Sequence, residues 1–133
     1  MEGKKLEILH VDDDADLGRA LGLVLQDICI IEFHSSSTSG LKAFEERLVS
    51  GNRPDLMILD FMMPDMDGPA LCKRIREIEK DHLVDAVKII ILSALTNPLH
   101  VREAFEAGCD AFLNKPVHKN NLLDEIRKLG LLA

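Results

Sequence analysis

The sequence predicts an α/β fold in which five β-α units form a parallel sheet covered by helices on both faces. One observation is that apolar runs of strand length alternate five times with segments of helical periodicity. Another is that the third and fourth apolar runs are not interrupted by polar residues, as expected of strands buried on both sides. The length of 133 residues is typical of one domain, so we expect a single domain over 1–133.

The strands are expected where β-branched and other apolar residues run together between turn-forming residues. The five predicted ranges are 6–11, 29–34, 55–59, 87–92 and 109–114.

The segments between the strands carry apolar residues three and four positions apart, which places them on one face of a helix. In the first helix this stripe is formed by Leu17, Ala20, Leu21, Val24 and Leu25. The later stripes are Leu71, Ile75 and Ile78, then Val101, Ala104 and Phe105, then Leu122, Leu123, Ile126 and Leu129. The second helix, over about 38–49, has the weakest pattern.

Residues at the expected helix ends agree with these assignments. Asp14 and Asp67 are predicted N-caps, and Asn97 precedes a proline at the first helical position. Gly108 is expected just past the end of the fourth helix.

Composition excludes several classes of protein. Hydrophobic residues make up 47% of the chain and charged residues 29%, which is ordinary for a folded globular domain. A net charge of −7 disfavours direct binding to nucleic acid or anionic lipid. No apolar stretch approaches the ~20 residues of a membrane helix. The three cysteines have no metal or disulfide spacing, so we expect buried thiols and a cytoplasmic location.

Polar side chains follow four of the five predicted strands. Asp12 and Asp13 follow the first strand, Asp60 the third, Ser93 the fourth and Lys115 the fifth. Ligands of open parallel sheets bind at the carboxyl ends of the strands, so these residues are expected to share one site.

The carboxylates predict a metal. If the first and third strands are neighbours, Asp12, Asp13 and Asp60 lie too close to ionise together without a compensating positive charge. Carboxylate oxygens with few other protein ligands favour hydrated Mg²⁺. An EF-hand calcium loop is excluded because the glycine and the glutamate that such a loop requires are absent here. With Lys115 beside the metal, Asp60 at the centre of the cluster is the expected nucleophile for a phosphoryl group.

The chain resembles, over essentially its whole length, the receiver domain of two-component response regulators. The matching motifs are VDD at 11–13, LDFMMPDMDG at 59–68, LSA at 92–94 and NKP at 114–116. The resemblance implies a flavodoxin-like (βα)5 three-layer sandwich with strand order 2-1-3-4-5.

The resemblance also implies a metal site. Asp60 is the implied phosphoacceptor, and Asp13 binds Mg²⁺ directly while Asp12 acts mainly through water. Asp60 and the backbone carbonyl of Met62 complete the protein ligands, and Mn²⁺ is expected to substitute for Mg²⁺.

The same resemblance assigns roles around the phosphoryl group. Ser93 would hydrogen-bond one phosphoryl oxygen and Lys115 would pair with another, while Phe112 would be the aromatic switch that turns inward as the Ser93 loop closes. The implied donor is a phosphohistidine on a sensor histidine kinase or a histidine phosphotransfer protein, and the receiver largely catalyses the transfer itself. The downstream effector is not specified by any residue.

Three positions depart from common family members. His10 replaces an aliphatic residue, and we have no functional account of it. Met62 and Leu95 are apolar where many members carry polar groups that position a hydrolytic water. We therefore expect slow self-dephosphorylation.

Three other functions compete with this interpretation. A haloacid-dehalogenase-like phosphatase would use Asp12 as nucleophile, but it would lack a later acidic pair and leave Asp60 without a role. A flavodoxin would need aromatic residues to stack on flavin, and the chain has no Trp or Tyr. A receiver-like module for protein contacts only would be favoured if one of the five site positions were substituted, and none of them is.

Other polar residues are interpreted as surface positions. We expect Asp65 in a solvated loop, and we expect a solvated third-helix face at Lys73, Arg74 and Arg76. The expected surface histidines are His34, His82, His100 and His118.

Overall fold

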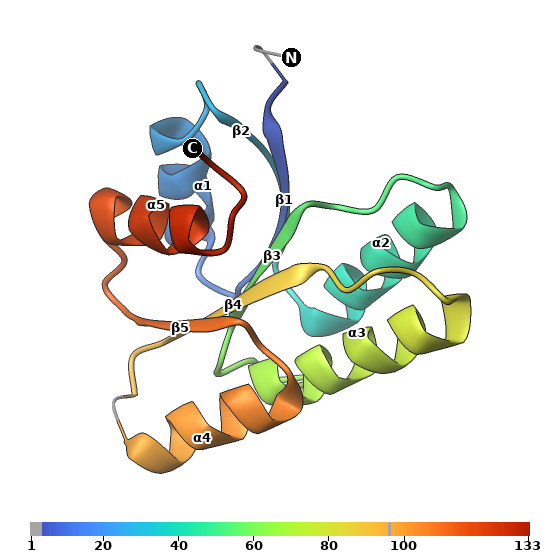
Figure 1. The fold of residues 1–133 in the computed structure, drawn as a ribbon. Coiled ribbons are helices and arrows are strands. Elements are labelled where there is room, and N and C mark those ends of the chain that lie inside the picture. The colour runs from blue at the N-terminus through green and yellow to red at the C-terminus, as the bar shows by residue number, and fades with distance from the viewer. Residues whose placement is uncertain (1–3, 96) are drawn as a thin grey trace.

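A five-stranded parallel sheet forms the centre of the fold, with helices on both faces (Figure 1). The computed structural model describes residues 4–95 and 97–133. The strand order is β2-β1-β3-β4-β5, so the flavodoxin-like topology is confirmed. The strands are β1 (Leu6–Val11), β2 (Cys29–His34), β3 (Leu56–Asp60), β4 (Lys88–Ser93) and β5 (Ala111–Asn114). The helices are α1 (Ala15–Val24), α2 (Ser37–Val49), α3 (Gly68–His82), α4 (Pro98–Ala107) and α5 (Lys119–Lys128).

Strand boundaries differ from the predicted ones by one or two residues. β3 and β4 each extend one residue further than expected, because Asp60 pairs with Leu92 and Ser93 pairs with Asn114. β5 begins two residues later because the amide of Cys109 still bonds to Ala104 of α4. Asp60 and Ser93, which were expected just after these two strands, are therefore their last residues.

Each face of the sheet has its own apolar core. α2, α3 and α4 pack on one face against Met57 and Leu59, while α1 and α5 pack on the other against Leu56 and Ile58 (Figure 1). Consecutive side chains of a strand point to opposite faces, so both sets must be apolar. This arrangement explains the unbroken apolar run of β3.

The predicted helix ends are confirmed. The side chains of Asp14, Asp67 and Asn97 accept hydrogen bonds from backbone amides of the first helical turn. Gly108 ends α4 with a φ of 109°, a left-handed conformation that favours glycine.

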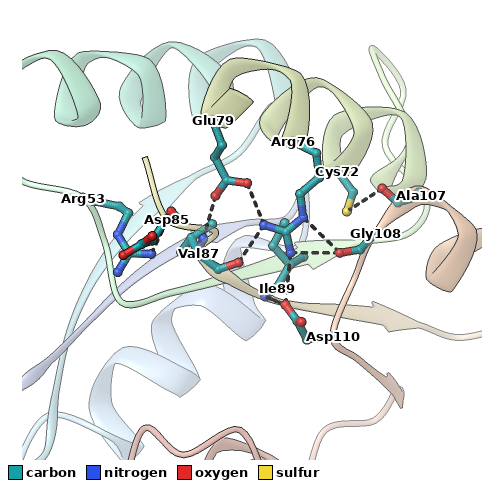
Figure 2. A network of polar contacts seen from close by, with 10 residues as sticks. All are labelled: Arg53, Cys72, Arg76, Glu79, Asp85, Val87, Ile89, Ala107, Gly108 and Asp110. Atoms are coloured by element: carbon teal, nitrogen blue, oxygen red, sulfur yellow. Dashed lines mark hydrogen bonds and ion pairs between the residues drawn. The ribbon is translucent and has the colours of Figure 1, made fainter. Parts of the chain in front are cut away.

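The prediction of a solvated Arg76 is wrong. Its guanidinium lies between α3 and the sheet, where it donates to the carbonyls of Val87 (2.8 Å) and Gly108 (2.8 and 3.0 Å) (Figure 2). It also pairs with Glu79 at 2.9 Å and Asp110 at 3.1 Å. This Arg76 network joins α3 to the start of β4 and to the turn between α4 and β5.

The cysteines Cys29, Cys72 and Cys109 are free and buried, as predicted. Burial raises the pKa of Cys72 to about 11 and that of Cys109 to about 12. Among the helices of the described residues, none combines the length and apolar character needed to cross a bilayer.

Candidate functional site

Four adjacent strands bring the predicted site residues to one edge of the sheet. β1, β3, β4 and β5 are parallel neighbours, so their carboxyl ends meet there. Val11 pairs with Leu59, which places Asp12 beside Asp60 at the ends of β1 and β3. Lys115 follows β5, and its amide donates to the Ser93 carbonyl at 2.8 Å.

Three carboxylates converge at this edge, as predicted. One oxygen each from Asp12, Asp13 and Asp60 can be chosen such that all three lie within 4.8 Å of one another. Asp12 and Asp60 are buried and Asp13 is exposed. The cluster therefore has two oxygen donors inside the protein and one that faces solvent.

Lys115 bridges the two buried carboxylates. Its Nζ lies 3.1 Å from Asp12 Oδ2 and 3.3 Å from Asp60 Oδ1. Burial acts to lower the pKa of Lys115, but its contacts with both aspartates outweigh burial and raise it. The ammonium thus stays charged and partly neutralises the cluster.

Asp60 and Asp12 respond differently to their surroundings. Burial and the charge of Asp12 raise the pKa of Asp60 to about 7, despite the attraction of Lys115. Burial also acts to raise the pKa of Asp12, but contacts with His10, the Asp14 amide and Lys115 outweigh it, so the pKa is lowered. Asp12 is therefore the carboxylate held ionised. The ionised form of Asp60 is the less stable of the two, so an added positive charge would stabilise it most.

A hard divalent cation fits this donor set. Asp12 Oδ2 is buried, and within 4–95 and 97–133 no group donates a well-directed hydrogen bond to it, although Lys115 Nζ and His10 Nε2 lie within ion-pair distance. Such an oxygen has a lone pair available for a metal ion or for a water molecule bound to one. Three carboxylate oxygens suit Mg²⁺ or Mn²⁺, which complete their coordination with water and carbonyl groups.

The remaining predicted residues lie around the cluster. Ser93 is buried at the end of β4, and its Oγ accepts from the Leu95 amide at 2.9 Å. Phe112 is half-buried and packs, like Leu95, against the core formed with α3 and α4. The side chain of Met62 is exposed and ends in a soft thioether that does not suit Mg²⁺, so the candidate ligand of this residue is its backbone carbonyl.

The loop after β3 passes close to the backbone of Asp60, and this explains a glycine in the 59–68 motif. A Cβ on Gly68 would lie 2.7 Å from the Asp60 carbonyl oxygen, so a larger residue would displace the start of α3. Asp65 is exposed in this loop, as expected, but its hydrogen bonds were not foreseen. Its carboxylate accepts three hydrogen bonds from Ser37 and Thr38 at the start of α2.

Two histidines contribute contacts that sequence reasoning missed. His10 is fully buried, with Nε2 3.5 Å from Asp12 Oδ2 and its ring edge-on to Phe33. His100 was expected at the surface, but it is half-buried and packs edge-on against Phe61, with ring centroids 5.1 Å apart. The position of His10 inside an apolar strand was the only sign of its burial.

The family model of the response regulator receiver domain matches residues 8–127. The chain belongs to the response regulator receiver domain family. This receiver domain is 34% identical over 125 residues to the transcriptional regulatory protein CseB of Streptomyces avermitilis, covering 93% of the chain and 48% of that protein. It is 33% identical over 131 residues to the DNA-binding response regulator MtrA of Mycobacterium tuberculosis, covering 96% of the chain and 51% of that protein.

Solved receiver domains have the same fold. A CheY-like receiver domain protein from Methanospirillum hungatei superposes with a TM-score of 0.79 at 25% identity, covering 95% of this chain and 94% of that one. The receiver domain of the histidine kinase CKI1 from Arabidopsis thaliana gives a TM-score of 0.81 at 29% identity, covering 94% and 89%. The chain spans about half the length of the curated relatives CseB and MtrA.

The raised pKa of Asp60 predicts a pH-dependent penalty in metal-free buffer. Between the ordinary pKa of 3.8 and about 7, Asp60 keeps its proton in the folded receiver and loses it in the unfolded chain, so its contribution to stability falls as pH rises through this window. Asp60→Asn should therefore raise the free energy of unfolding at pH ~8 by on the order of 2 kcal/mol, a gain that is limited because the variant also forfeits the attraction of Lys115.

Urea denaturation with a chelator present, at pH ~5 and ~8, measures this effect. The gain should be larger at the higher pH. Asp81→Asn, which neutralises an exposed carboxylate on α3, should change stability little at either pH. A metal-free Asp60→Asn domain that is less stable than the wild type at pH ~8 would contradict the assignment of a strained carboxylate.

Proposed function

We propose that this receiver domain is a phosphorylation switch in which Asp60 accepts a phosphoryl group from a phosphohistidine. The observation that carries the proposal is the buried Asp60 carboxylate, held beside Asp12 and in contact with Lys115, at an edge where three carboxylates converge. Family membership supports the same role.

The transfer follows from the groups present. An oxygen of Asp60 forms a bond to phosphorus while the bond between phosphorus and the donor imidazole breaks, and the freed imidazole takes a proton from solvent. Lys115 neutralises negative charge on the phosphoryl oxygens, and Ser93 supplies a hydroxyl after its loop closes. Mg²⁺, which Asp13, Asp60 and the Met62 carbonyl would hold directly and Asp12 mainly through water, would neutralise the remaining charge of the acids and the phosphoryl group.

The phosphorylated state is proposed to change the surface seen by a downstream partner, with inward rotation of Phe112 as part of that change. The donor partner is a sensor histidine kinase or a histidine phosphotransfer protein, in the cytoplasm. The net charge of −7 argues against nucleic-acid contact by this chain itself. Relatives of about twice its length include transcriptional and DNA-binding regulators, so output through such a domain is compatible with the proposal.

Incubation with acetyl phosphate and Mg²⁺ tests the proposal. Intact mass spectrometry should show one added phosphoryl group, lost in Asp60→Asn and on chelation of the metal. A haloacid-dehalogenase-like phosphatase would instead hydrolyse phosphomonoesters and lose that activity in Asp12→Asn. A module for protein contacts alone would show neither reaction.

Self-dephosphorylation is predicted to be slow. Met62 and Leu95, two residues beyond Asp60 and Ser93, offer no hydrogen-bonding side chain to orient an attacking water. The phosphorylated form should therefore persist well beyond seconds in Mg²⁺, as followed by mass spectrometry after donor removal. Met62→Asn should shorten its lifetime, whereas Leu99→Asn on the exposed face of α4 should not. A wild-type lifetime of only seconds would contradict the prediction.

A further inference from the structure

The middle of the loop that follows Asp60 is fastened to the first turn of α2. The carboxylate of Asp65 accepts from the Thr38 amide and the Thr38 hydroxyl, both at 2.8 Å, and from the Ser37 amide at 3.2 Å. In the opposite direction, the fully buried hydroxyl of Ser37 donates to the Met66 carbonyl at 2.6 Å. We call these four hydrogen bonds the loop latch.

The latch does more than cap a helix. α2 already has its own N-cap, Ser36, whose side chain accepts from the Ser39 amide at 3.1 Å. Asp65 accepts from different amides of the same turn, those of Ser37 and Thr38. It also accepts from the hydroxyl of Thr38, a residue 27 positions away in the sequence. The hydrogen bonds from Thr38, together with that from Ser37, lower the pKa of Asp65 to about 2, so the latch keeps its charge at neutral pH.

The two ends of the loop are fixed separately. The Phe61 amide donates to the Leu92 carbonyl in β4, and the Gly68 amide donates to the Phe61 carbonyl, both at 2.8 Å. Met62 is exposed and lies between this anchor and the latch, and it is followed by Met63, whose buried side chain packs into the core under α2, α3 and α4. The direction of the Met62 carbonyl therefore depends on restraints at both sides.

We propose that Asp65 is a positioning residue that, through Ser37 and Thr38, holds the 61–67 loop so that the Met62 carbonyl can bind the divalent cation. The inference rests on the proposed function, because it takes the Met62 carbonyl as a metal ligand. It assigns Asp65 and the start of α2, which lie outside the cluster of Asp12, Asp13 and Asp60, to the construction of the metal site.

Mg²⁺ affinity of the unphosphorylated chain, measured by isothermal titration calorimetry, tests the latch. Supporting residues outside a metal's own ligands typically alter affinity about tenfold or more, so Asp65→Ala should weaken Mg²⁺ binding by about tenfold. Asp65→Asn, which keeps an acceptor oxygen, should recover part of the affinity. Thr38→Val, which removes one hydroxyl, should weaken binding less than Asp65→Ala.

Ser36→Ala is the matched control. It removes the N-cap of the same helix turn, at a cost of about 1 kcal/mol in stability, without touching the loop. Mg²⁺ affinity should remain that of the wild type. Amide hydrogen exchange across 61–67 should accelerate in Asp65→Ala and not in Ser36→Ala.

The outcomes separate the latch from the proposed function. If the wild type binds Mg²⁺ and Asp65→Ala binds it equally well, the latch is overturned and the proposed function stands. Equal weakening in Ser36→Ala and Asp65→Ala also overturns the latch, because general destabilisation of α2 would then explain both. A wild-type chain that binds no Mg²⁺ overturns both proposals.

Discussion

Replacing Arg76 with alanine is expected to lower the free energy of unfolding by about 3 kcal/mol. The guanidinium satisfies two backbone carbonyls and pairs with Glu79 (Figure 2). The side chain of Glu79 is only 4% exposed. Its removal leaves a buried carboxylate without its cationic partner and two carbonyls without their donor, which is the costly way to break a buried ion pair. Denaturation by urea, followed by far-ultraviolet circular dichroism because the chain has no Trp or Tyr, measures the loss.

Arg74→Ala provides the control on the same helix. Arg74 pairs with Glu77 at 2.8 Å, but both side chains are more than half exposed, so the expected loss is within about 0.5 kcal/mol. If the two variants lost equal stability, the Arg76 network would not hold α3 to the sheet as described.

Replacing Lys115 with methionine is expected to slow phosphorylation of Asp60 by acetyl phosphate about 100-fold, a loss typical of removing one group that stabilises transition-state charge. Methionine keeps an unbranched side chain of similar length but removes the charge that contacts Asp12 and Asp60. Mg²⁺ affinity should not fall, because a nearby positive charge repels the cation. Slower phosphorylation together with undiminished Mg²⁺ affinity would show that a catalytic charge has been lost and that the metal site is intact.

Lys119→Met is the control for this experiment. Lys119 is exposed at the start of α5, and its replacement by methionine changes the net charge by the same amount. The Lys119→Met variant should be phosphorylated at the wild-type rate. A Lys115→Met chain that is phosphorylated at the wild-type rate would remove Lys115 from the transfer.

The fold class and the cluster of acidic residues could be predicted from the sequence, because both depend on patterns local to a strand. An unbroken apolar run such as that of β3 can be recognised without knowing its neighbours, and an aspartate at its end must lie at the sheet edge. The neighbouring strand order, however, came from resemblance to a family, since local patterns do not determine which strands pair.

The contacts that the sequence did not predict join residues that are distant from one another along the chain. Arg76 bonds to carbonyls 11 and 32 residues away, and Asp65 bonds to an amide 27 residues away. A backbone carbonyl or amide has no signature in the sequence, so neither pairing could be predicted. For Arg76 one pattern was available, since it lies one turn from the buried Cys72 and Glu79 on the same helix face.

Identification of the phosphorylated residue tests most directly the central claim that Asp60 is the phosphoacceptor. The chain would be phosphorylated in Mg²⁺, the acyl phosphate reduced with borohydride to a stable alcohol, and the site mapped by peptide mass spectrometry. We predict a single modified residue, Asp60. Modification at Asp12 or Asp13, or a labelled chain in which Asp60 is unmodified, would contradict the account.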